Sequence, residues 1–227
     1  MIAKPPAAPS SEAELIVRAH AIAGLTLGEL AARFERRVPE QPRHAKGWAG
    51  QLVELALGAT AGSRAEPDFQ AIGVELKTLP VTATGQPAES TYVCTVALVH
   101  ERAPTWDDSL VRHKLDRVLW LPVESAPERP IGERRIGMGL LWSPSPEQAE
   151  LLRADWEEFM DLICLGRVEE ITAHHGQCLQ IRPKAADASA RRRGIDAAGE
   201  VMRTLPRGFY LRSTFTADIL AGAYATP

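Results

Sequence analysis

Residues 67–78 of this 227-residue chain read PDFQAIGVELKT, and this stretch decides the fold. Two acids, Asp68 and Glu75, and one lysine, Lys77, interrupt an otherwise apolar run. Partial alternation of apolar residues predicts a tight strand pair or bulged hairpin, bent at the single glycine. Side chains two positions apart on a strand point to the same face, so we expect Glu75 and Lys77 to leave one face together, within reach of Asp68.

Helix and strand signals surround this stretch in a mixed order. Capping patterns and apolar periodicity predict helices at about 11–23, 26–36, 46–57, 145–165, 188–203 and from 216 onward. Strands are expected at 117–123 and 136–142, near 178–181 and 208–211, and at 91–99, where an uncharged, β-branched run predicts a central strand buried on both faces. The predicted buried stripe of the 145–165 helix is Leu151, Leu152, Trp156, Phe159, Met160 and Ile163. The predicted fold class is α/β (α+β), with helices flanking a mixed sheet.

Composition narrows the class of protein. With 45% hydrophobic and 24% charged residues, the chain has ordinary globular composition. No uncharged run exceeds eleven residues, far short of the roughly 20 apolar residues that cross a bilayer, and acids in the first thirty residues argue against a secretory signal. Three cysteines are too few for a disulfide framework or a four-cysteine zinc site. We therefore expect a soluble protein in the bacterial cytoplasm, with no membrane association.

Charge is unevenly distributed along the chain, although the net charge is only −3. Residues 147–170 hold eight acids and two bases, whereas residues 182–212 hold eight bases and three acids, and residues 33–46 hold five bases and two acids. The basic segments either line one site for a polyanion or are simply solvated helix faces. For the arginine run at 191–193 we favour a solvated helix face over a phosphate clamp.

The acid–acid–lysine group suits metal-assisted chemistry on a phosphodiester. Two carboxylates suit a hard divalent cation, and the carbonyl of Leu76 between them offers a further oxygen ligand. Lys77 can neutralise the charge that builds on a pentavalent phosphorane. Glu54 is either a third carboxylate at the cation or a solvent-facing helix residue. The simpler alternative for Glu75 and Lys77 is an ion pair at the rim of a sheet.

Further motifs occur along nearly the whole chain. They are KGW at 46–48, Glu54, LG at 57–58, AGS at 61–63, PD at 67–68, GVELKT at 73–78, VRHKL at 111–115, RVLW at 117–120, LWSP at 141–144, QIRPKA at 180–185 and LPRGFYL at 205–211. The chain resembles the MutH family of methyl-directed DNA mismatch-repair endonucleases, within the restriction-type PD-(D/E)xK nuclease superfamily. The resemblance lies in these motifs, in their order along the sequence and in the length of the chain. The resemblance implies a restriction-endonuclease-like fold: a single nuclease domain, 1–227, with two lobes, about 1–105 and 106–227, around a DNA cleft.

The resemblance also implies roles for individual residues. Asp68 and Glu75 would bind Mg²⁺, with Mn²⁺ as a substitute, and Glu54 would support the metal or its water. Lys77 would be the catalytic lysine, and Lys114 would support the scissile phosphate. The implied DNA contacts are Lys46, Tyr92, Arg182, Pro183, Lys184 and Tyr210. Of these, Tyr92 departs from the phenylalanine expected at a position that wedges into the base stack.

The implied substrate is double-stranded DNA containing GATC, nicked 5′ to the G on an unmethylated strand. Arg182 suits the O6/N7 edge of guanine, and Lys184 would lie near the exocyclic amine of adenine. The implied partner is MutL, and indirectly MutS, with the chain acting as a monomer. Two alternatives stay open: a restriction-type enzyme that makes double-strand breaks, and a non-catalytic module that senses adenine methylation.

Overall fold

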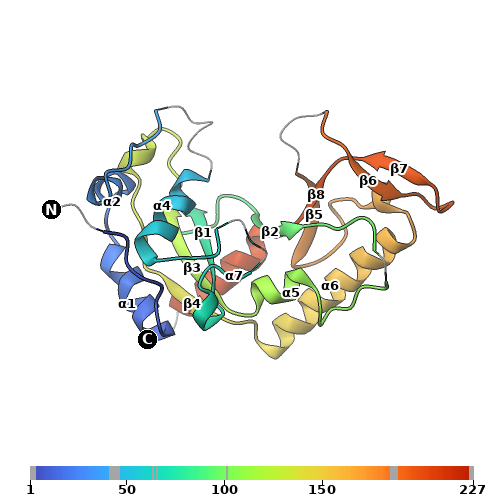
Figure 1. Cartoon of the computed structure of the whole chain (residues 1–227), viewed down its shortest axis with the longest axis horizontal. Helices are drawn as coiled ribbons and strands as arrows, with labels where there is room; N and C mark the ends of the chain where they lie inside the picture. The colour runs from blue at the N-terminus through green and yellow to red at the C-terminus, as the bar shows by residue number, and fades with distance from the viewer. Residues whose placement is uncertain are drawn as a thin grey trace. The chain divides into compact units, whose positions relative to one another are not determined.

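The structure is a computed structural model of residues 1–227, and it describes residues 4–40, 47–62, 64, 66–100, 102–184 and 189–224. The chain forms two compact units, each discontinuous in sequence (Figure 1). Unit 1 comprises Met1–Glu89, Asp116–Ser143 and Ala223–Pro227, and unit 2 comprises Ser90–Leu115 and Pro144–Gly222. This division differs from the single boundary near residue 105 that the sequence suggests, because the chain passes between the units four times. Each unit contains both helices and β-sheet, which confirms the mixed α/β class.

Unit 1 is built on a three-stranded mixed sheet in the order β1-β3-β4. Its strands are β1 (Glu75–Val81), β3 (Val118–Glu124) and β4 (Leu140–Trp142). β1 and β3 are parallel, and β4 is antiparallel to β3. β3 lies in the middle of the sheet and is buried along its length except at its last residue, Glu124, which is partly exposed. The strand predicted at 136–142 is shorter than expected, because Ile136 makes only an isolated bridge to Val123 before β4 begins.

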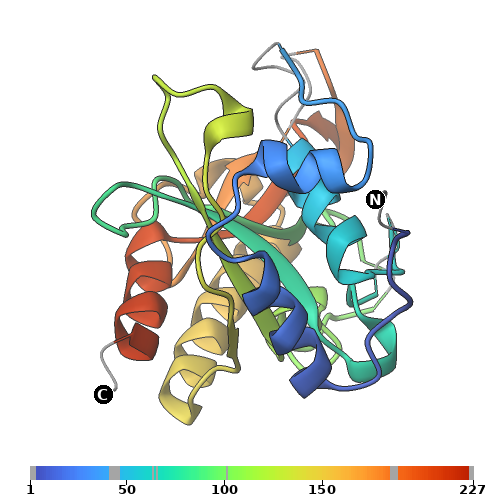
Figure 2. The ribbon, with the colours of Figure 1, turned by 90° about the vertical axis from the view of Figure 1, so that its left-hand side faces the viewer.

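Three helices cover one face of this sheet (Figure 2). They are α1 (Glu12–Ile22), α2 (Leu27–Arg33) and α4 (Trp48–Leu57), and a short η2 turn (Ile131–Glu133) packs beside α2. The hydroxyl of Thr26 and the side chain of Glu29 form the predicted capping box at the start of α2. Leucine, valine and alanine side chains from the three helices pack with Leu76, Leu119 and Leu121 from the sheet, forming one hydrophobic core.

Unit 2 contains a separate antiparallel sheet in the order β2-β8-β5. The strands are β2 (Thr91–Thr95), β8 (Arg207–Leu211) and β5 (Leu179–Pro183), and the helices of the unit are α5 (Leu110–Leu115), α6 (Pro146–Cys164) and α7 (Ser213–Tyr224), whose last two residues belong to unit 1. The prediction of a central strand at 91–99 is wrong. β2 is an edge strand that stops at Thr95, because β8 takes the middle position and pairs with both neighbours.

The predicted helix at 188–203 is also wrong: this segment is an antiparallel hairpin of β6 (Arg192–Ile195) and β7 (Val201–Thr204). Asp196 closes its turn, since its Oδ1 accepts hydrogen bonds from the backbone N–H of Ala198 and Glu200, each 2.9 Å long. Gly199 follows with a φ of +84°, which glycine adopts at little cost. The turn makes a helix impossible here, so Arg192 and Arg193 of the arginine run lie on β6 instead of on a helix face.

The long helix α6 forms as predicted, except that Asp155 takes the buried position expected for Leu151. Ser145 caps it, Pro146 begins it, and Trp156, Phe159 and their neighbours are buried. Leu151, however, is 38% exposed, whereas Asp155 is only 4% exposed. The buried stripe is therefore centred one position further round the helix, on the row of residues 152, 155, 156 and 159. In the part of the chain that the structure describes, no helix combines the length and apolar character needed to span a membrane.

Candidate functional site

The segment that leads into β1 is a compact turn. Phe69 and Val74 exchange two backbone hydrogen bonds, of 2.9 and 3.3 Å, around the 3₁₀ turn η1 (Gln70–Ile72). Gly73 reverses the chain with a φ of +66°. The predicted strand pair is therefore only a single bridge between Phe69 and Val74. The turn nevertheless brings Asp68 back to the beginning of β1, as the sequence predicts.

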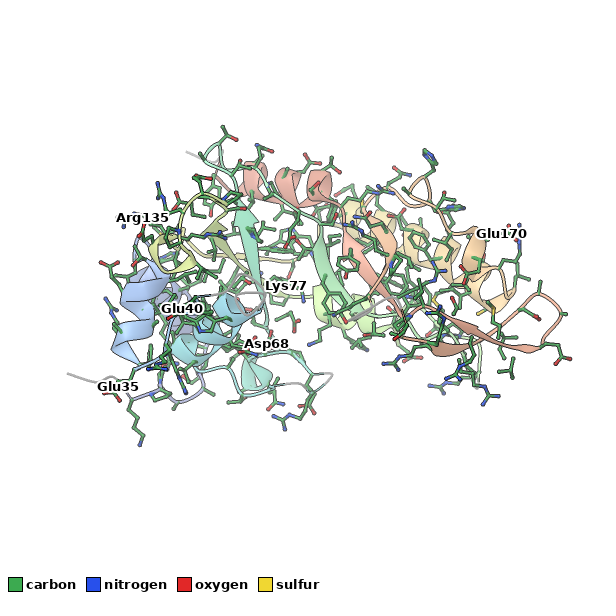
Figure 3. The ribbon with its side chains drawn as sticks, turned by 90° about the horizontal axis from the view of Figure 1, so that it is seen from above. Glu35, Glu40, Asp68, Lys77, Arg135 and Glu170 are labelled. Atoms are coloured by element: carbon green, nitrogen blue, oxygen red, sulfur yellow. The ribbon has the colours of Figure 1, made fainter. Side chains whose placement is uncertain are left out.

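Asp68 is fixed from both its backbone and its side chain. Its Oδ2 accepts a 2.8 Å hydrogen bond from the backbone N–H of Leu76, between the positions of Glu75 and Lys77. Its carbonyl accepts a 3.0 Å hydrogen bond from the N–H of Thr60, in the loop after α4. The residue is 9% exposed, and Asp68 and Lys77 are labelled in Figure 3. The Asp68 carboxylate is thereby held against the first residues of β1.

Glu75 and Lys77 form a buried ion pair on one face of β1. The Lys77 Nζ lies 2.8 Å from the Glu75 Oε1, and the two side chains are 10% and 6% exposed. The parallel register puts Glu75 beside Val118 and Lys77 beside Trp120 on β3. Burying a charge beside such apolar neighbours is unfavourable unless it is paired, and here each of the two charges has the other as a partner. The alternative of an ion pair at the rim of a sheet is therefore right about the pairing, but the pair is buried.

The donors in this corner fit a hard cation. Asp68 and Glu75 contribute carboxylate oxygens, and Leu76, the residue that follows Glu75, offers a backbone carbonyl oxygen; Mg²⁺ prefers oxygen ligands of this kind. Glu54 lies on α4, which packs against β1, and is partly exposed. Among the described residues, no three Asp, Glu, His or Cys side chains are grouped closely enough to hold a metal ion together. The role expected for Glu54 stays a prediction, and Lys46 lies outside the described residues.

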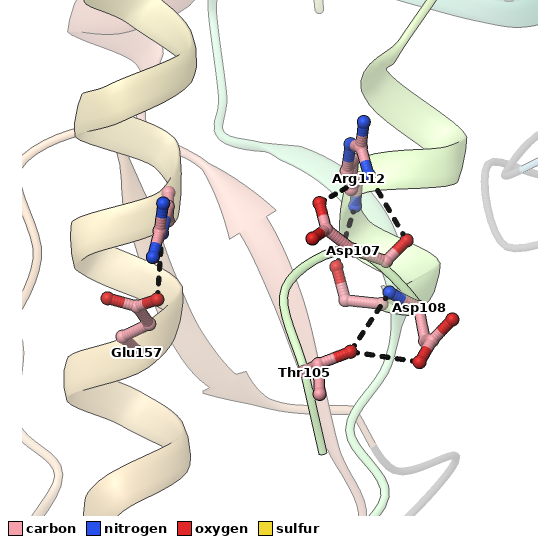
Figure 4. A network of polar contacts seen from close by, with 7 residues as sticks. Thr105, Asp107, Asp108, Arg112 and Glu157 are labelled. Atoms are coloured by element: carbon pink, nitrogen blue, oxygen red, sulfur yellow. Dashed lines mark hydrogen bonds and ion pairs between the residues drawn. The ribbon is translucent and has the colours of Figure 1, made fainter.

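Lys114 lies in unit 2, near the end of the short helix α5, and is 9% exposed. Polar contacts order the turn before this helix (Figure 4). The Thr105 hydroxyl donates a 2.9 Å hydrogen bond to the Asp108 carboxylate, and the Arg112 Nη1 lies 2.6 Å from the Asp107 Oδ1. This network fixes where α5 begins and so holds the backbone that carries Lys114.

Four of the expected DNA contacts of unit 2, two tyrosines and two basic residues, meet on one face of its sheet. Tyr92 on β2 and Tyr210 on β8 are directly paired, and their rings meet edge to face with centroids 5.4 Å apart. The Lys184 Nζ lies 2.8 Å from the centroid of Tyr92, and the Arg182 guanidinium lies 5.8 Å from that of Tyr210. Arg182, Pro183 and Lys184 are all exposed. The structure thus brings together a pair of aromatic rings with a cation over each.

Comparison with known proteins is decisive. Residues 57–155 match the family model described as DNA mismatch repair enzyme MutH. Over 217 residues, the chain is 55% identical to the DNA mismatch repair proteins MutH of Yersinia pseudotuberculosis (strain PB1/+) and Yersinia pestis (strain Pestoides F), and 54% identical to that of Yersinia enterocolitica (strain NCTC 13174 / 8081). Each alignment covers 96% of this chain and 95% of the relative.

The chain belongs to the MutH family. It is therefore a DNA mismatch repair enzyme of a mixed α/β fold. The segment that matches the MutH model contains Asp68, Glu75 and Lys77 from unit 1, together with Tyr92 and Lys114 from unit 2. The other expected residues lie outside this matched segment: Lys46, Glu54, Arg182, Pro183, Lys184 and Tyr210.

Two contacts in this MutH chain explain how the tyrosine pair is held, and sequence reasoning missed both. The Tyr92 hydroxyl lies 2.9 Å from the Thr95 Oγ1, which gives the extra hydroxyl of this position a partner. Gly208 lies beside both rings: a Cβ there would be 2.9 Å from a Tyr92 ring carbon and 3.2 Å from a Tyr210 ring carbon. The glycine of the LPRGFYL motif was the only signal that could have pointed to this close approach.

Asp155 is a third residue that the sequence did not single out. Its carboxylate accepts hydrogen bonds from the backbone N–H of Gln177, Cys178 and Leu179, at 2.8, 2.6 and 2.7 Å. It thereby ties α6 to the start of β5, the strand that carries Arg182. Burial raises the pKa of the adjacent Cys178 thiol to about 11, so this thiol stays protonated and unreactive at neutral pH. The only sequence signal for Asp155 was an acid in line with the apolar stripe of α6.

Proposed function

We propose that this chain is a Mg²⁺-dependent endonuclease that nicks the unmethylated strand 5′ to the G of hemimethylated or unmethylated GATC. The observation that supports the proposal is the buried start of β1, where Asp68 accepts a hydrogen bond from the N–H of Leu76 and Glu75 pairs with Lys77. Two acids and a lysine in one apolar corner suit phosphodiester hydrolysis better than a purely structural role, since a salt bridge of this kind adds little net stability.

Each residue has a distinct task in the proposed reaction. The chemistry that Mg²⁺ supplies when bound is Lewis acidity toward a phosphate oxygen and toward a water. Asp68 and Glu75, with the Leu76 carbonyl, would hold the ion, and Glu54 would orient a water. Lys77, now 2.8 Å from Glu75, would turn toward the phosphate and neutralise the developing negative charge. Lys114 would support the scissile phosphate.

Sequence preference is assigned to unit 2. Arg182 is exposed and lies beside Tyr210, so its planar fork is available for the O6 and N7 of guanine. Lys184 and Tyr210 would contact the adenine side, where a methyl group on the exocyclic amine takes up space and displaces a contact. Discrimination between strands would then come from the methylation state of one adenine.

We further propose that the protein acts as a monomer and is activated by MutL. One Asp68–Glu75–Lys77 group per chain matches one cut strand per binding event. MutL activation is inferred from membership of the MutH family. A low basal rate would follow if the cutting-competent conformation is rarely populated and MutL binds it preferentially.

A strand-resolved nicking assay tests the proposal. Duplexes with one unmethylated, hemimethylated or fully methylated GATC, each strand carrying a different label, are incubated with Mg²⁺, with and without MutL and ATP. We expect cutting only of unmethylated strands, stimulation by MutL, no cutting in EDTA, and no cutting by Glu75→Gln. Glu128→Gln, an exposed acid of the same unit, is the matched control and should cut normally.

Two results would contradict the proposal. Equal cutting of both strands of hemimethylated duplex, or concerted double-strand breaks, would favour the restriction-type alternative. Binding that depends on methylation, without any cutting in the presence of MutL, ATP and Mg²⁺, would favour the non-catalytic reader.

A further inference from the structure

The β6–β7 hairpin places two arginines directly opposite each other. Arg193 on β6 pairs with Arg203 on β7 in the antiparallel register, so both side chains leave the same face. Both are exposed. Like charges directly opposite on a two-stranded ribbon are destabilising. Within the part of the chain that the structure describes, neither side chain has a hydrogen bond or an ion pair, so none of the described acids pairs with either arginine to offset the repulsion.

The other face of the hairpin is anchored to unit 2. Thr204 on this face is buried, and its hydroxyl donates a hydrogen bond to Glu169 in the 3₁₀ turn η3 (Val168–Glu170). This hydrogen bond holds the pKa of Glu169 below its usual range. Gly194 packs over Leu98: a Cβ built on Gly194 would lie 3.9 Å from the Cβ of Leu98. Arg193 and Arg203 are therefore turned away from the body of the unit by contacts on the opposite face.

The turn of the hairpin is anchored as well. Gly166, just after α6, lies so close to Asp196 that a Cβ there would be 2.1 Å from the Asp196 carbonyl carbon. With one face and its turn both in contact with the unit, the hairpin presents its arginine face in a fixed direction. A rigid ribbon of this kind is suited to a surface of fixed geometry, such as duplex DNA.

The hairpin also grows out of the strands that carry the proposed base contacts. β5 and β8 are paired as far as Pro183 and Arg207, and the N–H of Lys184 donates a 2.7 Å hydrogen bond to the Pro206 carbonyl. The chain therefore leaves the sheet beside Arg182, forms the hairpin, and returns to the same place (Figure 1). A DNA duplex bound at Arg182 would bring its flanking phosphates toward this excursion.

We propose that the face of the hairpin formed by Arg193 and Arg203 binds backbone phosphates of the duplex that flanks the recognised sequence. The inference rests on the proposed function and adds to it a contact that does not depend on sequence. Phosphates would supply the negative charge that the described residues do not bring to these two arginines. Arginine suits the role because its planar fork binds a phosphate through two hydrogen bonds.

The test compares Arg193→Gln/Arg203→Gln with the wild type in duplex binding, followed by fluorescence anisotropy without divalent ions over a range of KCl concentrations. The matched control is Arg153→Gln/Arg167→Gln, which removes two exposed arginines of the same unit that are paired with Glu157 and Glu170. Two probes are used: a short duplex with little beyond GATC, and one with about 10 bp, a helical turn, on each side.

For the hairpin variant on the long duplex, we expect the slope of log affinity against log salt to fall by about 2, since each lost phosphate contact removes about 0.9. The ratio of affinities for GATC and GATC-free duplexes should stay the same, and the short duplex should respond little. The unfolding temperature without DNA should not fall, because a repulsive pair has been removed.

Three results would overturn the inference: an unchanged salt slope, an equal loss in the control variant, or a loss confined to GATC duplex. The failure of the proposed function looks different, because these binding measurements do not require cutting. The wild-type chain could bind GATC-free and GATC duplexes equally while the hairpin variant still shows a smaller salt slope. That result would support the phosphate contacts of the hairpin and contradict the proposed specificity. A wild-type chain that binds no duplex would contradict both.

Discussion

At the scale of single residues, the buried pair of Glu75 and Lys77 makes a prediction that separates stability from chemistry. Lys77→Met leaves the Glu75 carboxylate, 6% exposed, without the cation 2.8 Å away. Removing one partner of a buried pair destabilises a protein by up to about 3–5 kcal/mol. We therefore expect a large drop in the free energy of unfolding, measured by urea titration without Mg²⁺, together with loss of nicking.

The double variant Glu75→Gln/Lys77→Met distinguishes the two effects. It contains no unpaired charge, so its free energy of unfolding should lie well above that of Lys77→Met, while nicking stays absent. If the single and double variants were equally unstable, the ion pair would not be what holds these side chains in the corner. If the double variant still nicked DNA, the proposed catalytic roles would be wrong.

Gly208 gives a second prediction at this scale. In Gly208→Ala the new methyl group would meet the rings of Tyr92 and Tyr210 at 2.9 and 3.2 Å, so the rings must move apart. Overpacking of this kind costs about 1–3 kcal/mol. We expect weaker binding of GATC duplex and a smaller preference over GATC-free duplex. Gly222→Ala is the matched control, because the new methyl group would meet no atom within 4 Å beyond its chain neighbours and the adjacent backbone of its own helix; an equal loss in both variants would contradict the role of the tyrosine pair.

Sequence reasoning identified the residues of the candidate corner but not the contacts that hold them. Strand alternation put Glu75 and Lys77 on one face, and the glycine bend brought Asp68 to them, because both effects are local in sequence. The hydroxyl partner of Tyr92 and the space left by Gly208 depend on which strands become neighbours. Alternation along one strand does not specify its neighbour, so these features could not be predicted from the local pattern.

At the scale of secondary-structure elements, Asp155 connects α6 to β5. Its carboxylate accepts three backbone hydrogen bonds in a nearly fully buried position. In Asp155→Asn the amide NH₂ would face backbone donors, leaving buried N–H groups unpaired at about 1–3 kcal/mol each. We expect a lower free energy of unfolding and weaker DNA binding, since β5 carries Arg182. Asp161→Asn, exposed on the same helix, should change neither; normal DNA binding by Asp155→Asn would show that β5 is positioned by other contacts.

Elements with strong terminal signals were predicted well, and those that depend on tertiary pairing were not. Thr26 and Ser145 cap α2 and α6 through hydrogen bonds that lie within four residues of sequence, so the patterns were sufficient. The segment at 188–203 has no such cap, and its turn at Asp196 outweighs its helical periodicity. The edge position of β2 depends on β8, more than a hundred residues later, which local patterning does not reveal.

At the scale of the whole molecule, the chain builds its two units from interleaved segments. Asp68, Glu75 and Lys77 lie in unit 1, whereas Arg182 and Tyr210 lie in unit 2. Charge segregation along the sequence hinted at separate acidic and basic regions, but a boundary drawn at one residue number cannot describe a chain that passes between units four times. The lobes around a DNA cleft that the sequence suggests remain a prediction.

Because Glu75 lies in unit 1 and Arg182 lies in unit 2, their substitutions should have separable effects. Arg182→Ala should reduce the preference for GATC over a single-base variant of the site by about 1–3 kcal/mol, while the nicking that remains stays dependent on Mg²⁺. Glu75→Gln should do the opposite, abolishing nicking while the binding preference persists. Competition binding and single-turnover nicking on matched duplexes measure the two quantities independently. If Arg182→Ala abolished nicking at saturating protein without changing the binding preference, recognition and cutting could not be assigned to separate units, and Arg182 would belong to the chemistry itself.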